Sequence, residues 1–173
     1  TFVFVGRIGR EKSIDVLIRA AAGAAARDPE IRLVFIGEGP NRAEMERLAR
    51  DLGLGETVRF LGRIPHAELL RSGFLHHARG FVTASVTENQ PMTVIEAVRC
   101  GLPLVVADVV GMRELSDGNA LRCPPGDAEA LGDALARLAG DDRLYRELGA
   151  KSRAFSSRFD GREVAKSFVE EYE

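Results

Sequence analysis

The sequence predicts an α/β fold, a Rossmann-like and mainly parallel sheet with helices on both faces. Short apolar runs alternate along the chain with segments of helical periodicity, which is typical of βα units stacked into one sheet. At 173 residues, with 45% hydrophobic and 29% charged residues, the chain can bury a core without disulfides or a structural metal. Because no internal repeat, low-complexity tract or linker is present, residues 1–173 are expected to form a single domain.

The apolar runs and helical segments can be assigned in order. Strands are expected at residues 2–5, 31–36, 58–61, 80–83 and 104–107. Helices are expected at about residues 13–27, 41–52, 66–71, 91–100, 128–138, 141–157 and 162–172. Ser13 is a plausible N-cap of the first helix, and Gly53 is a C-terminal stop of the second.

Function is expected in the loops at the carboxyl ends of the strands, where open α/β sheets bind their ligands. These loops comprise residues 6–12, 37–41, 62–66, 85–93 and 108–114.

Charge and cysteine content exclude several function classes. The net charge of -2 comes from 24 basic and 26 acidic residues spread along the chain, so no general affinity for nucleic acid or anionic membrane is expected. Cys100 and Cys123 form no disulfide framework, and no signal-peptide pattern or membrane-spanning apolar run appears. A reduced, cytoplasmic setting is therefore expected, and a partner domain could supply peripheral membrane contact.

The first loop combines glycines with two cations. Gly6 follows the first strand, and Arg7 and Lys12 lie close to a helix N-terminus, where backbone amides and the helix dipole favour an anion. This arrangement suits a diphosphate. The alternative is that both cations are solvated loop charges.

The fourth loop places two carboxylates around the start of a helix. Pro91 is suited to the first helical position, and the free amides of Met92 and Thr93 could hold a diphosphate. Glu88 and Glu96 would then accept hydrogen bonds from hydroxyls on either side of it. Alternatively, Glu88 complements the helix dipole and Glu96 is a surface residue. If Glu96 faces inward on its largely apolar helix, it needs a partner.

The segment from Glu88 to Glu96, continued by residues 97–107, resembles the donor-site motif of the retaining GT-B glycosyltransferases of family 4, or group 1. Three further segments agree with it, namely Gly6-Arg7 with Glu11-Lys12, Phe60-Leu61-Gly62, and Pro124-Pro125-Gly126-Asp127 as the turn after the last strand. The resemblance extends from residue 2 to about residue 164. It implies that the chain is the donor-binding, C-terminal half of a GT-B fold, and that the N-terminal acceptor domain is absent.

The resemblance also implies roles for single residues. Arg7 and Lys12 would hold the diphosphate together with the amides of Met92 and Thr93, and would stabilise it as the leaving group. Glu96 would bind the ribose, and Glu88 would face the sugar near its anomeric carbon. The base would be framed by the loops at Gly37, Gly39, Arg63 and Ile64, and the donor would be a nucleoside-diphosphate sugar of the UDP or GDP type. No metal and no cofactor would be needed.

The sequence departs from the family pattern at several positions. Pro91 replaces a usual glycine and Gln90 a bulky apolar residue, which changes the expected contacts to the donor sugar. Ser13 stands where glycine commonly follows the lysine, and Gly111 is followed by Met112 where the family has a glycine pair. These departures motivate a second hypothesis, a non-catalytic nucleotide-binding scaffold. A third is a sugar-nucleotide epimerase on the same fold.

Other patterns are weaker. Gly37-Glu38-Gly39-Pro40-Asn41-Arg42 begins like a dinucleotide-binding loop, but Arg42 replaces the third glycine. Adjacent His76 and His77 point in different directions on either helix or strand, so they do not predict a metal site. Cys100 and Cys123 are interpreted as packing residues.

Overall fold

The computed structural model describes residues 1–87 and 92–157. It contains one six-stranded parallel sheet in the order β3-β2-β1-β4-β5-β6. The strands are β1 (Phe2–Val5), β2 (Leu33–Ile36), β3 (Val58–Gly62), β4 (Gly80–Thr83), β5 (Leu104–Ala107) and β6 (Ala120–Cys123). The α/β prediction is therefore confirmed.

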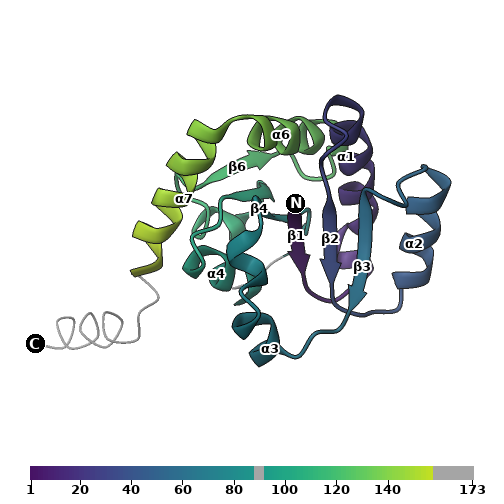
Figure 1. Cartoon of the computed structure of the whole chain (residues 1–173), viewed down its shortest axis with the longest axis horizontal. Coiled ribbons are helices and arrows are strands. Elements are labelled where there is room, and N and C mark those ends of the chain that lie inside the picture. Colours follow the sequence, from purple (N-terminus) through teal and green to yellow (C-terminus); the bar gives the residue numbers. More distant parts are fainter. Residues whose placement is uncertain (88–91, 158–173) are drawn as a thin grey trace, which may run out of the picture.

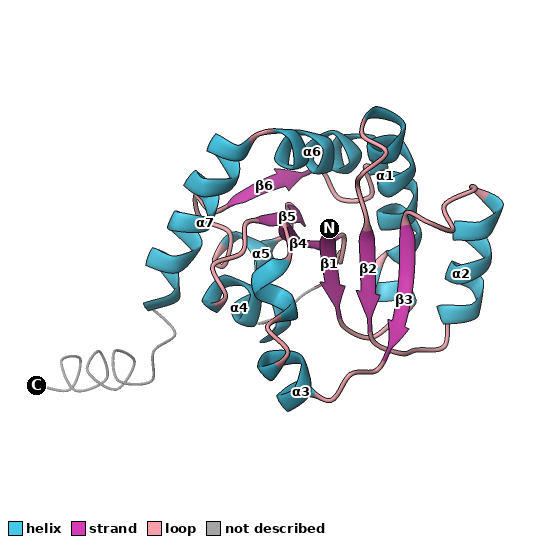
Figure 2. Cartoon of the chain, in the orientation of Figure 1, coloured by secondary structure: helices cyan, strands magenta, loops and turns pink. Residues whose placement is uncertain are grey.

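Helices cover both faces of this sheet (Figure 2). They are α1 (Ile14–Arg27), α2 (Arg42–Asp51), α3 (His66–Arg71), α4 (Met92–Arg99), α5 (Val110–Arg113), α6 (Ala128–Gly140) and α7 (Asp142–Ser156), with 3-10 turns η1 (Arg10–Lys12) and η2 (Phe74–His77). The expected helix at 162–172 lies outside the described residues.

Alternation along the strands creates the two-sided core. In β1, Phe2 and Phe4 belong to the cluster that includes α1, α2 and α6 residues, whereas Val3 belongs to the cluster that includes α3, α4 and α5 residues. The same alternation occurs in β5, where Val105 faces the first cluster and Leu104 the second. The strands β1 and β5 are thus apolar on both sides, as expected for the interior of a buried parallel sheet.

Two sequence expectations need correction. The sheet has a sixth strand, β6, that the apolar runs did not predict. Ser13 precedes α1 but makes no side-chain capping bond, because the chain enters the helix from η1 with Ser13 at φ 47 and ψ 48. Gly53 does follow α2 with a positive φ of 70, as the C-terminal stop requires.

Candidate functional site

The sheet order reverses between β1 and β4, and the loops after β1, β2 and β3 lie together at one end of the sheet (Figure 1). The chain runs outward in one direction after β1 and in the other after β4, which leaves a crevice at the carboxyl ends of the strands. Two adjoining pockets lie there, and both include Val5, Gly6 and Arg7.

The first pocket gathers the residues expected to hold a diphosphate. Its volume is about 200 Å³, and its lining includes Gly6, Arg7, Lys12, Met92 and Thr93. The two cations come from the loop after β1, whereas Met92 and Thr93 form the first turn of α4. The first amides of a helix have no intrahelical partner, so they and the two cations provide one positive environment.

A buried serine holds the cation-bearing loop in place. Ser85 follows β4 and is fully buried, and its Oγ lies 3.1 Å from the backbone oxygen of Glu11 and 3.2 Å from that of Thr87. The first of these contacts fastens the turn carrying Lys12 to the loop that leads into α4. Sequence reasoning did not identify Ser85, because its partner lies 74 positions away.

Arg7 is exposed and only loosely paired. Its Nη1 lies 3.7 Å from Oε1 of Glu11, with 67% and 41% of the two side chains exposed. An ion pair so exposed to solvent contributes little net free energy. The guanidinium can therefore leave Glu11 for a stronger anion at little cost.

The second pocket has a volume of about 440 Å³, and three of its lining residues are glycines. Gly37, Gly39, Arg63 and Ile64 line it, as does Glu38. All the residues proposed to frame the base thus lie around one cavity, next to the residues proposed to hold the diphosphate.

Glycines are required in this wall because two loops approach closely. A Cβ on Gly37 would lie 1.9 Å from the backbone oxygen of Gly6, and Gly37 has a φ of +145. A Cβ on Gly39 would lie 2.2 Å from the oxygen of Ile8. Hydrogen bonds between the loops, such as that from the amide of Ile8 to the oxygen of Glu38 at 2.9 Å, hold this approach.

Arg42, at the start of α2, braces the same loop. Its Nε donates to Glu46 at 2.7 Å, Nη1 pairs with Glu38, and Nη2 donates to the oxygen of Phe60 at 3.3 Å. The hydrogen bond to Glu46 and the charge of Glu38 raise the pKa of the guanidinium. Arg42 therefore ties the loop after β2 to the end of β3.

Glu96 does face inward, and the structure supplies the partner that such a residue needs. Its side chain is 17% exposed, and Oε1 lies 2.7 Å from Nε2 of His66 at the start of α3. Sequence reasoning did not identify His66. Glu96 lines neither pocket but lies one turn beyond Thr93 on α4.

The remaining predicted site residues, Glu88, Gln90 and Pro91, lie outside the described residues. Glu88 was expected to face the donor sugar near its anomeric carbon and to act in catalysis with Arg7 and Lys12, and this role stays a prediction.

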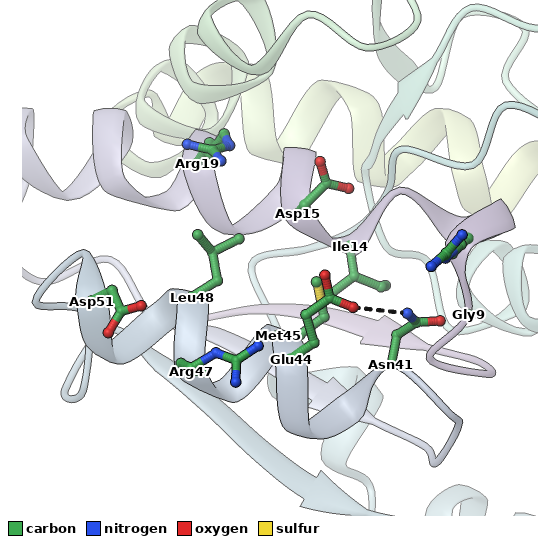
Figure 3. Close-up of a pocket in the computed structure, with 11 residues that line it drawn as sticks. Gly9, Ile14, Asp15, Arg19, Asn41, Glu44, Met45, Arg47, Leu48 and Asp51 are labelled. Atoms are coloured by element: carbon green, nitrogen blue, oxygen red, sulfur yellow. Dashed lines mark hydrogen bonds between the residues drawn. The ribbon is translucent and has the colours of Figure 1, made fainter.

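Two other pockets contain none of the predicted donor-binding residues. One, of about 440 Å³, lies between α1 and α2, where Ile14, Met45 and Leu48 form its apolar part (Figure 3). The other, of about 560 Å³, lies beyond β4 between Val86 and α5. The pocket between α1 and α2 is lined by three arginines and three carboxylates, so its charges give no net preference for an anion.

Within residues 1–87 and 92–157, no group of three or more histidine, cysteine or acidic side chains is arranged to hold a metal ion. No helix in that part of the chain has the length and apolar content needed to cross a bilayer.

Comparison with known sequences identifies the family. Residues 1–155 match the family model described as glycosyl transferases group 1. A D-inositol 3-phosphate glycosyltransferase of Nocardia farcinica is 34% identical over 98% of this chain and 39% of its own length. An exopolysaccharide phosphotransferase of Streptomyces coelicolor is 31% identical over 98% of this chain and 18% of its length. The chain therefore spans less than half of these relatives.

Comparison with solved structures confirms the fold. The pneumococcal O-GlcNAc transferase GtfA, solved with UDP and GlcNAc, has a TM-score of 0.86 at 21% identity, over 98% of this chain and 34% of that one. The C-terminal domain of a group 1 glycosyl transferase from Francisella tularensis has a TM-score of 0.79 at 21% identity, over 90% and 84%. Sucrose-phosphate synthase of Thermosynechococcus elongatus has a TM-score of 0.80 at 30% identity, over 99% and 44%. The chain belongs to the group 1 glycosyltransferase family and has the Rossmann-like fold of its GT-B members.

Proposed function

We propose that this chain is the donor-binding half of a retaining glycosyltransferase, which transfers a sugar from a nucleoside-diphosphate sugar to an acceptor hydroxyl. The observation that carries the proposal is the convergence of Arg7, Lys12 and the first turn of α4 on one pocket, which adjoins the glycine-lined pocket at Gly37 and Gly39. The acceptor would be held by a further domain, since the chain spans only 39% of the Nocardia farcinica relative.

The two pockets suit successive parts of such a donor. The diphosphate would lie beside Arg7, Lys12 and the amides of Met92 and Thr93. The base would enter the pocket lined by Arg63 and Ile64. Backbone groups of the surrounding loops would supply the hydrogen bonds. Glu96 would bind the ribose between them, and Glu88 would face the sugar.

The chemistry follows from the charges at the first pocket. The bond from the anomeric carbon to the diphosphate breaks through an oxocarbenium-like state, and a bond to the acceptor oxygen forms on the same face. The proton of the acceptor hydroxyl passes to the departing diphosphate. Arg7 and Lys12 stabilise the negative charge that develops on the leaving nucleoside diphosphate. They provide this charge without a metal ion.

UDP is our first choice of nucleotide, because the pneumococcal structure of the same fold was solved with UDP. The two cysteines are free thiols, which fits a reducing, cytoplasmic setting for the whole enzyme.

The test is calorimetric titration of the chain with UDP, GDP and ADP, and then with matching sugar nucleotides, without and with a divalent metal. We expect metal-independent binding of one nucleotide. Arg7→Ala should weaken it about tenfold, because an exposed guanidinium contributes at the low end of the range for charged contacts.

Arg10→Ala is the matched control. Arg10 lies in the same loop but lines the pocket between α1 and α2, so its loss should leave nucleotide affinity unchanged. A folded chain that binds none of the three nucleotides would contradict the proposal. Equal affinity for nucleoside diphosphate and sugar nucleotide would instead favour the scaffold hypothesis.

A further inference from the structure

We propose that His66 is a positioning residue, which fixes the carboxylate of Glu96 so that it can bind the two ribose hydroxyls of the donor. The inference rests on the proposed function and deepens it. The observation behind it is the 2.7 Å contact between Nε2 of His66 and Oε1 of Glu96, which joins α3 to α4.

The chemistry of the two groups defines the direction of the bond. A carboxylate only accepts hydrogen bonds, so the imidazole is the donor. A carboxylate has two oxygens and about four lone-pair sites. Because His66 occupies one of them on Oε1, Oε2 and the second site on Oε1 are left for ligand hydroxyls. A vicinal diol offers two donors at a spacing suited to one carboxylate.

The burial of the two side chains shows why Glu96 needs this partner. The side chain of Glu96 is 17% exposed and shares its helix with the buried residues Val94, Ala97 and Val98. In such surroundings a carboxylate without a hydrogen-bond partner is costly. In the described part of the chain, His66 is the only side chain that hydrogen-bonds to Glu96.

The position of the bond relates it to the donor pockets. His66 follows Ile64, which lines the second pocket, by two residues. Glu96 follows Thr93, which lines the first pocket, by three residues and so lies on the same side of α4. The bond therefore joins a residue that follows the lining of one pocket to a residue that follows the lining of the other, where the proposed order of the donor puts the ribose.

A purely structural interpretation is that the bond only packs α3 against α4. The two interpretations differ in one measurable quantity, the preference of the chain for a ribose over a sugar without its hydroxyls. Holding α3 in place affects both ligands equally. Orienting Glu96 affects only the ligand that has hydroxyls to donate.

The experiment is calorimetric titration of the chain with UDP and 2′,3′-dideoxy-UDP, and with GDP and its dideoxy analogue. We expect the wild type to bind the ribose form of its nucleotide at least about tenfold more tightly, as one or two hydrogen bonds to a charged acceptor provide. His66→Ala should reduce this ratio to about threefold or less, with little change in dideoxynucleotide affinity. His66→Gln, which keeps an N–H donor, should restore much of the preference for the ribose form.

His76→Ala is the matched control, since it removes another exposed imidazole, which lies in η2 away from both donor pockets. Because the side chain of His66 is 63% exposed, its replacement should not unfold the chain. If the wild type prefers the ribose form over the dideoxy form and His66→Ala shows the same preference, the inference is wrong while the proposed function stands. If the wild type binds nucleotide without discrimination, Glu96 does not bind the ribose and the inference falls with that assignment. If no nucleotide binds, the proposed function fails as well.

Discussion

Ser13, the residue before α1, has a left-handed backbone conformation. As a serine before a helix it predicts a side-chain cap, yet its φ of 47 and ψ of 48 place it in the left-handed region without a capping bond. Its backbone amide instead donates to the oxygen of Arg10 at 3.1 Å and completes the turn that carries Lys12. Residues other than glycine occupy this region at a cost of about 1 kcal/mol.

We therefore expect Ser13→Gly to keep the free energy of unfolding or to raise it by up to about 1 kcal/mol, since relief of the left-handed conformation offsets the flexibility of glycine. Ser13→Val should lower it by about 2 kcal/mol, because a β-branched residue is poorly tolerated there. Urea unfolding followed by circular dichroism measures both. Equal stability of the two variants would show that the conformation is not constrained.

At the same scale, the sequence predicted much of the candidate site but not its supporting contacts. Arg7, Lys12, Met92 and Thr93 could be named because each lies at a strand end or helix start that is visible locally, and the structure places them around one pocket. Ser85 and His66 could not be named. Their roles depend on partners that only the folded chain brings near, at separations of 74 and 30 positions.

The helices α1 and α6 pack closely against each other through small residues. A Cβ on Gly132 of α6 would lie 2.9 Å from the backbone oxygen of Ala20 on α1. Ala20, Ala21 and Ala24 are fully buried, so the two helices approach each other without large side chains between them. The approach fixes α1, whose first turn follows the cation-bearing loop.

Gly132→Ala should lower the free energy of unfolding by about 1 to 2 kcal/mol, because the overlap with a backbone atom outweighs the better helix propensity of alanine. Gly23→Ala is the matched control on α1. A Cβ on Gly23 would meet no atom of the described residues within 4 Å, so alanine there should raise stability by about 0.5 to 1 kcal/mol. Thermal and urea unfolding of both variants check the difference in sign, and a stabilising Gly132→Ala would contradict the close packing.

Helices could be predicted from the sequence where their apolar periodicity extends over several turns, and strands could be predicted where all or nearly all of their residues are buried. The three strands β1, β4 and β5 have the expected bounds, and all four residues of β4 and of β5 are buried. The sixth strand was missed because β6 lies at the edge of the sheet, where only Cys123 of its four residues is buried and Arg122 is exposed. The one-turn elements η1 and α5 are too short to show a period.

The stability of the whole molecule should depend on the buried thiol of Cys123, which ends β6 and contacts α6. Its side chain is in contact with the backbone oxygen of Ala130, with Sγ at 3.5 Å. Burial, together with the charges of Asp127 and Asp133, raises the pKa of the thiol from 9.0 to about 11. Both cysteines were interpreted as packing residues, and the burial of Cys123 agrees with this.

This shift makes the stability of the fold depend on pH. Between pH 9 and 11 the unfolded chain releases a proton that the folded chain keeps, so the free energy of unfolding should fall as the pH rises. Other groups titrate in the same range, so the quantity to measure is the difference between wild type and Cys123→Ala. At pH 7.5 the variant should be less stable, because it loses packing. At pH 10.5 this loss of stability should be smaller by about 1 to 2 kcal/mol, because only the wild type has to keep the Cys123 thiol protonated in the folded state.

Cys100→Ala is the control at a half-buried thiol, and its effect on stability should change less between the two pH values. If Cys123→Ala costs the same stability at both pH values, solvent reaches the Cys123 thiol in the folded state.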